Sequence, residues 1–156
     1  MIVSALKSGA DIYVGFDANF AENRVHIHRN FHKTDTSLLA LTGKPNILDI
    51  AKNLFVYSET TRETMVEFTQ NLHEAIPERY GDYSMLVASQ GGILFEISNE
   101  NIFEIEDFTA IGTGYEYALG ALFASKSPPR LRVEESIRAA SRFQPECGGG
   151  IHVERL

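Results

Sequence analysis

The feature that most limits the possible folds of this chain is the spacing of its hydrophobic residues. Along the chain this spacing changes, in a definite order, between the period of a strand and the period of a helix. Stretches that alternate or run apolar, rich in β-branched and aromatic residues, are typical of strands, and apolar residues at helical spacing are typical of helices. Along this sequence the period predicts strands, two helices, strands, two helices and a last strand. Because strands are grouped with strands and helices with helices, the pattern indicates a layered α+β fold rather than alternating βαβ units.

The positions of the elements follow from this period. The first two strands form a hairpin around a turn at residues 7–11, and Gly43 ends a continuous apolar run that is typical of a buried strand. Asn46 is predicted to cap the first helix, and Pro77 to end the second. The predicted strands lie at 2–9, 11–18, 24–33, 37–43, 83–98 (a hairpin), 101–107, 108–114 and 146–156, and the predicted helices at 46–57, 58–76, 114–125 and 127–143.

Composition limits the classes of partner. The 156 residues fit one domain, 1–156, and the formal net charge of −7 argues against a nucleic-acid partner, which would need an excess of Lys and Arg. No apolar run approaches the roughly 18 residues that a membrane span needs, so no membrane partner is expected. The single cysteine, Cys147, cannot form an internal disulfide, which suits a reducing compartment such as the cytoplasm, or an assembled particle.

Two local patterns have a functional interpretation and a simpler structural one. His26 and His28 share a face of the predicted strand at 24–33, and His32 has the same parity, so three imidazoles could hold a transition metal. No carboxylate partner is evident beside them, and exposed polar residues on an outer strand face explain the spacing better. Three glycines at 148–150 could cradle an anion, yet no helix start follows them, which favours a tight turn. We therefore expect no metal and no cofactor.

Five segments resemble, in order and at compatible spacing, segments of the proteasome β subunits and of the related bacterial HslV peptidase. The opening hairpin ends in Asp17, and "FHKT" places Lys33 where that family keeps its catalytic lysine. "LALTGKPNILDIAKNLF" resembles the family's entry into its first long helix. "FTAIGTGYEYALGAL", the most specific of the five, resembles the turn into its third helix. "RAASRFQPECGGGIHVERL" resembles its last helix end, glycine turn and final strand, so the resemblance covers nearly the whole chain.

The resemblance implies a four-layer αββα sandwich of the N-terminal nucleophile (Ntn) hydrolase type, with helices outside two packed antiparallel sheets. It also implies assembly into six- or seven-membered rings. In that family residue 1 is a threonine whose hydroxyl attacks a peptide carbonyl, and its own amine, supported by a lysine and an aspartate, is the base. The implied site positions here are Met1, Asp17 and Lys33, and the implied cleft-lining residues are Gly112, Thr113, Gly114, Tyr115 and Cys147.

Residue 1 does not fit that chemistry. Met1 offers a thioether, which has no proton to lose and is a poor nucleophile toward an amide. Ser4, the nearest hydroxyl, should point to the opposite face of its strand and cannot replace it. The other departures from the family pattern are Asn19, Tyr115, Gln144 and Cys147.

The remaining site residues have structural interpretations. We expect Asp17 and Lys33 to neutralise one another in a cleft, since removing either would leave an uncompensated charge. Cys147 is expected to be buried and inert, because a nucleophilic cysteine needs an adjacent base and a lowered pKa, and His152 is not placed against it. The turn "GTG" at 112–114 leads into a helix N-terminus, which suits an oxyanion.

Two classes of function follow from these residues. The first is a non-catalytic HslV-like subunit that self-assembles into a ring with a structural or scaffolding role, alone or with other subunits of a larger assembly such as a virus particle. The alternative is a threonine-type or Ntn-type peptidase subunit of an HslV-like ATP-dependent protease, which needs chemistry at Met1 or Cys147. A third possibility is an unrelated α/β binding module, which would be a monomer.

Overall fold

The structure is a computed structural model that describes residues 1–18 and 30–156. Its elements are predominantly those that the hydrophobic period predicts. The strands are β1 (Ile2–Ser8), β2 (Asp11–Ala18), β3 (Phe31–Lys33), β4 (Ser37–Thr42), β5 (Ser84–Ser89), β6 (Ile93–Ser98), β7 (Ile102–Glu104), β8 (Phe108–Gly112) and β9 (Gly150–Arg155). The helices are α1 (Pro45–Leu54), α2 (Arg62–Ala75), the 3-10 turn η1 (Glu78–Tyr80), α3 (Tyr115–Ala124) and α4 (Pro129–Phe143).

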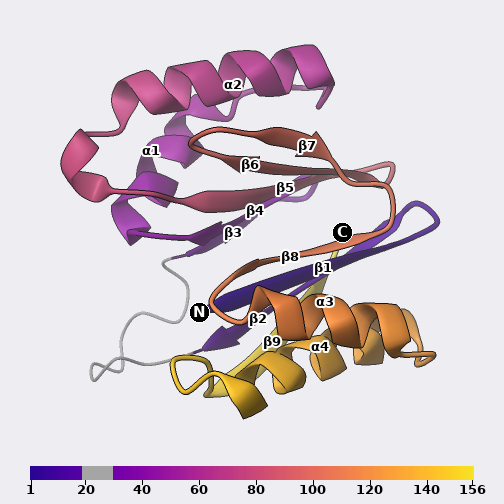
Figure 1. Cartoon of the computed structure of the whole chain (residues 1–156). Coiled ribbons are helices and arrows are strands. Elements are labelled where there is room, and N and C mark those ends of the chain that lie inside the picture. The colour runs from indigo at the N-terminus through magenta and orange to yellow at the C-terminus, as the bar shows by residue number, and fades with distance from the viewer. Residues whose placement is uncertain (19–29) are drawn as a thin grey trace.

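The described strands form two antiparallel sheets stacked face to face. One sheet has the strand order β8-β1-β2-β9 and the other the order β3-β4-β5-β6-β7. Figure 1 shows α1 and α2 covering the outer face of the second sheet, and α3 and α4 covering the outer face of the first. The predicted four-layer αββα sandwich is therefore confirmed.

Three buried clusters separate the four layers, and strand alternation assigns side chains to them. In β4, Leu39 and Leu41 pack toward α1 and α2, whereas Leu38 and Ala40 pack between the sheets. Both faces of the strand are covered, which explains why this segment reads as a continuous apolar run in the sequence. The third cluster, between the first sheet and α3 and α4, includes Ile2 and Leu6 of β1 together with residues of both helices.

The helix starts differ from the sequence prediction. Lys44, not Asn46, occupies the N-cap of α1, and no side chain caps this helix. Pro45 at the first helical position lacks an N–H and has its φ preset for a helix, so the start needs no capping side chain. The second helix starts at Arg62 rather than 58, because Thr61 and Thr64 form a reciprocal capping box.

Other predicted boundaries are confirmed or lie outside the described residues. The extended Ile76 follows α2 and precedes Pro77, as expected for a helix ended by proline. Of the strand predicted at 24–33, the described part contains β3 at 31–33. His26, His28 and Asn19 lie outside the described residues, and the described residues contain no group of three metal-ligating side chains.

None of the helices in the described part of the chain combines the length and the apolar character needed to cross a bilayer. Most large apolar side chains of the described residues are buried between the layers, and most of the exposed ones lie on α3 and α4.

Candidate functional site

The ends of β1, β4 and β8 meet around residue 1. The backbone oxygen of Met1 accepts a hydrogen bond from the Thr113 N–H at 3.1 Å. The Asn30 side-chain amide lies 3.3 Å from the Met1 sulfur and 3.3 Å from the Gly43 oxygen, donating to both. The Met1 side chain is half-buried and packs against the cluster between the sheets. A thioether therefore occupies the position of the nucleophile that the sequence resemblance implies.

Asp17 holds two backbone segments together at this site. The residue is 2% exposed, and its Oδ1 accepts from the Ile2 N–H at 2.7 Å, while its Oδ2 accepts from the Gly148 N–H at 2.8 Å. Ile2 starts β1, and Gly148 lies in the turn that precedes β9. The carboxylate thus joins the first strand to the glycine turn at 148–150, and both of its oxygens are engaged by backbone donors.

Lys33 has a different partner from the predicted one. Its Nζ lies 3.0 Å from Oε2 of Glu154, in an ion pair whose side chains are 35% and 42% exposed. The predicted neutralisation of Lys33 by Asp17 is therefore wrong. Within the described residues, the lysine pairs with Glu154 and the aspartate binds backbone N–H groups.

Strand alternation explains this exchange of partners. Lys33 pairs in register with Leu38, and Glu154 with Val14; both apolar residues face the layer between the sheets. The lysine and the glutamate therefore face one another across that layer. Asp17 has the parity of Gly15, whose Cβ position would meet side chains of α4. The β2 pleat thus directs Asp17 toward the helices and away from Lys33.

The turn at 112–115 approaches residue 1 closely. Gly112 has φ +97°, and a Cβ built on it would lie 2.3 Å from the Met1 oxygen. Gly114, in the left-handed conformation, precedes the first residue of α3, Tyr115, which is 45% exposed. The turn does lead into a helix N-terminus as predicted, but the Thr113 amide already donates to Met1.

Cys147 lies on the helix side of this site. It is buried in the cluster beneath α3 and α4, and its thiol donates to the Thr113 oxygen at 3.0 Å. Burial raises the pKa of the thiol, and the Asp17 and Glu146 carboxylates raise it further, against the opposing effect of the Met1 amino group. A raised pKa reduces the thiolate fraction at neutral pH, which supports the predicted inert role.

We expect Cys147 to react slowly with iodoacetamide in the folded protein. The alkylation rate of a buried thiol with a raised pKa should rise at a higher pH than that of a free cysteine, because the thiolate is the reacting species. Mass spectrometry of samples quenched across pH 7 to 10 measures the rate, with urea-unfolded protein as the control. Alkylation at neutral pH as fast as in the unfolded chain would contradict the buried assignment.

The remaining candidates, Ser4, His152 and His32, lie in different layers of the fold and do not come together. Ser4 is fully buried, and its parity places it on the α4 side with Ile2, opposite to Met1 as predicted. His152 stacks on Phe16 between the sheets, with ring centroids 5.4 Å apart, whereas Cys147 packs on the other face. His32 is half-buried, and burial, followed by the nearby Lys52, lowers its pKa.

The structure thus brings together Met1, Asp17, Thr113 and Cys147, with Gly112 and Gly114 shaping the turn beside them. Sequence reasoning missed Asn30 and Glu154. Glu154 could have been found from the register of the β2–β9 pair, but Asn30 has no local sequence signal, because its contact with Met1 spans 29 residues.

Comparisons with known proteins agree with this architecture. No protein-family model and no curated protein matches the sequence. Among solved structures, BPH from Thiobacillus denitrificans in complex with epoxomicin matches with TM-score 0.79 and 20% identity, over 100% of this chain and 98% of that chain. Eukaryotic HslV from Trypanosoma brucei matches with TM-score 0.82 and 16% identity, over 100% and 99%. The helically assembled Anbu complex from Pseudomonas aeruginosa matches with TM-score 0.66 and 10% identity, over 100% and 81%.

These neighbours place the fold in the class of four-layer αββα sandwiches typical of Ntn hydrolases. Within that class, the chain has the fold of the HslV and proteasome β-subunit group, as the sequence resemblance implied. At 20% identity and below, the likeness establishes the fold.

Proposed function

We propose that this chain is a non-catalytic HslV-like subunit that assembles with copies of itself into a ring and has a structural or scaffolding role. The proposal combines a site without a suitable nucleophile and an outer helical surface suited to self-association. The setting predicted from the sequence, the cytoplasm or a virus particle, stays a prediction.

The observation that carries the proposal is the environment of residue 1. Acyl transfer by an Ntn mechanism needs a hydroxyl or a thiol there, with a free base beside it. Met1 supplies a thioether that accepts a hydrogen bond from Asn30. Asp17 and Lys33, the two supporting groups implied by the resemblance, are engaged by backbone amides and by Glu154 respectively.

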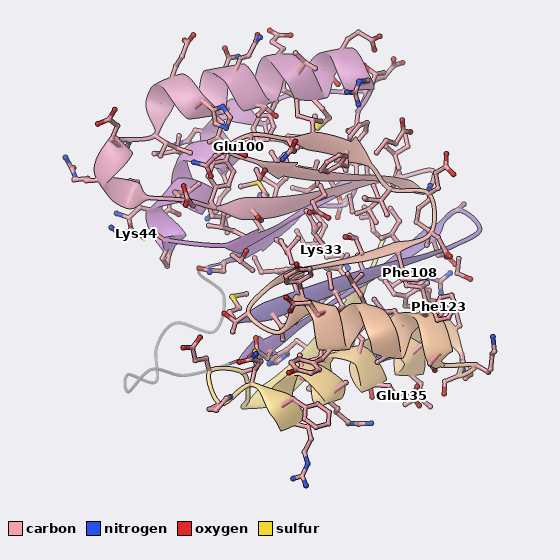
Figure 2. The ribbon with its side chains drawn as sticks, viewed as in Figure 1. Lys33, Lys44, Glu100, Phe108, Phe123 and Glu135 are labelled. Carbon is pink, nitrogen blue, oxygen red and sulfur yellow. The ribbon has the colours of Figure 1, made fainter. Side chains whose placement is uncertain are left out.

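Self-assembly is supported by exposed aromatic residues on the α3 and α4 layer. Phe123 is 76% exposed and Phe143 is 63% exposed, and Phe143 stacks on Tyr117 at a centroid distance of 5.0 Å. Figure 2 shows Phe123 on α3, in the outermost layer of the fold. Large exposed apolar groups on one face are typical of interaction surfaces. The Anbu complex, which shares the fold, was solved as a helical assembly.

The catalytic half of the proposal is tested with epoxomicin, the compound bound to the BPH neighbour. Intact-mass spectrometry after incubation with excess epoxomicin should show unmodified protein, because residue 1 has no hydroxyl or thiol to add to the ketone of this epoxyketone, the addition that precedes opening of the epoxide by the α-amine. Hydrolysis of fluorogenic peptides should likewise equal the buffer rate. A covalent adduct that maps to Met1, or peptidase activity lost on Lys33→Ala, would overturn the non-catalytic assignment.

The assembly half is tested by mass photometry and light scattering. The wild-type chain should form particles several times the monomer mass of 17.4 kDa. Phe123→Glu should shift the population toward monomer, because it places a charge in the proposed interface. Val56→Glu is the matched control, since Val56 is equally exposed but lies beyond α1 on the opposite layer. A monomeric wild type would refute self-assembly.

A further inference from the structure

A cavity lies at the end of β4 away from residue 1. It has a volume of about 530 Å³ and is bounded by the connector between α1 and α2 (residues 55–61), the start of β4 and the β5–β6 turn. The other end of β4, at Thr42, lies next to Gly112 and therefore beside Met1. Six strand residues span about 17–20 Å, so this cavity is distinct from the Met1 site.

Buried hydroxyl groups line one side of the cavity. Ser37 and Ser89 are opposite one another in the β4–β5 register, and Thr60 of the connector lies over them. All three residues are buried, and the Thr60 and Ser89 hydroxyl oxygens are 2.5 Å apart. Each hydroxyl has one donor and two acceptor sites, so the pair retains hydrogen-bonding capacity toward a ligand.

Aromatic and aliphatic groups line another part of the wall. Phe55, Tyr57 and Ile93 are half-buried, and the two rings meet edge to face with centroids 5.9 Å apart. Both rings also contact Phe68 in the core, which fixes the apolar wall to the α2 layer. A wall held by the core in this way is pre-formed, and binding a ligand costs little reordering.

The charge of the cavity limits the class of ligand. The described residues that line it include no Lys, Arg or His, and their one carboxylate is that of Glu59. Phosphate or carboxylate ligands would therefore meet no counter-charge and one repulsive charge. The hydroxyls and the Gln90 amide offer both donors and acceptors, which complement a neutral ligand that carries many hydroxyl groups.

We propose that this cavity is a binding site for a neutral carbohydrate of one or two sugar units. A sugar ring has hydroxyl groups at its edge and an apolar C–H face, and the cavity presents hydroxyls beside aromatic rings. The volume falls in the usual range of ligand pockets, roughly 300–1,000 Å³. This inference stands on the cavity alone and is independent of the function proposed for the Met1 site.

The test is ligand-observed saturation-transfer NMR on the full chain, with D-glucose, maltose and N-acetylglucosamine as probes. At least one sugar should receive saturation, and glucose 6-phosphate should bind more weakly than glucose because of Glu59. Thr60→Val keeps the shape of the side chain and removes the hydroxyl, so we expect affinity to fall about tenfold, the loss of one hydrogen bond. Circular dichroism verifies that each variant is folded.

A second pair of variants keeps the proposal falsifiable if Thr60→Val destabilises the protein. Thr36 is exposed and lines the cavity, so Thr36→Trp should fill it and abolish binding. Asp35→Trp changes the neighbouring exposed residue, which does not line the cavity, and should leave binding unchanged. No saturation of any of the three sugars, equal binding of glucose 6-phosphate, or binding that survives Thr36→Trp would overturn the proposal.

Discussion

Replacing Asp17 by Ala is expected to lower the free energy of unfolding by about 2–6 kcal/mol, since two N–H donors lose their acceptor and each unpaired donor costs about 1–3 kcal/mol. The carboxylate accepts from the N–H groups of Ile2 and Gly148, and Ile2 is fully buried. Alanine offers neither acceptor. Asp17→Asn keeps one acceptor oxygen and turns an N–H₂ group toward the other donor, so it should be intermediate.

Urea unfolding followed by circular dichroism measures this effect, and Lys33→Ala is the control. The Lys33–Glu154 pair is partly exposed, and such pairs typically contribute about 0–1 kcal/mol. A double-mutant cycle on Asp17 and Lys33 then distinguishes the observed geometry from the predicted pair. Because the two side chains have separate partners, their effects should add to within about 0.5 kcal/mol. A coupling energy well above this value would indicate a direct ion pair between Asp17 and Lys33 and would contradict the observed geometry.

The layered fold could be predicted because its signal lies within each element. The apolar run at 37–43 is buried on both faces, as Leu38 and Leu39 show by packing into different clusters, and such a run identifies a strand inside a sandwich. The period change at residue 46 and the proline at 77 likewise mark the helical layer with purely local residues.

The site was predicted less well because its contacts are set by register between distant strands. The parity of Lys33 and of Asp17 can be read within each strand, but which layer each face meets depends on the pairing of β2 with β9 and on how the two sheets stack. Those are long-range properties, and they give Lys33 a partner 121 residues away. The resemblance implied site positions, but it did not determine their hydrogen bonds.

Under the proposed non-catalytic function, the side chain at residue 1 accounts for the structural contacts that Asp17 and Lys33 make. A catalytic lysine and aspartate would have to support an amine and a hydroxyl on residue 1. With Met1 packed against the inter-sheet cluster and its sulfur bound by Asn30, no such group needs support. Asp17 serves the backbone of β1, and Lys33 joins the two sheets through Glu154 at their margin. These contacts order the backbone around residue 1.

Gly112→Ala is expected to be among the most damaging single substitutions in the chain, with a loss of about 3–5 kcal/mol from overpacking and backbone strain combined. The residue has φ +97°, a backbone conformation that is strained for any residue with a side chain. A Cβ added there would also lie 2.3 Å from the Met1 oxygen and 2.8 Å from the Thr42 methyl group. The nearest obstacle is backbone, which cannot rotate away. Accommodating alanine would also disturb the Thr113–Met1 hydrogen bond.

Gly120→Ala is the matched control for this prediction. Gly120 lies inside α3, and nothing lies within 4 Å of a Cβ added there. Alanine should stabilise the helix by about 1 kcal/mol, because glycine is the poorer helix former. If the turn at 112 is built as the structure shows, urea unfolding should give a lower free energy of unfolding for Gly112→Ala and a higher one for Gly120→Ala. A Gly112→Ala protein as stable as wild type would mean that residue 1 does not pack against this turn, and the environment assigned to Met1 would then be wrong.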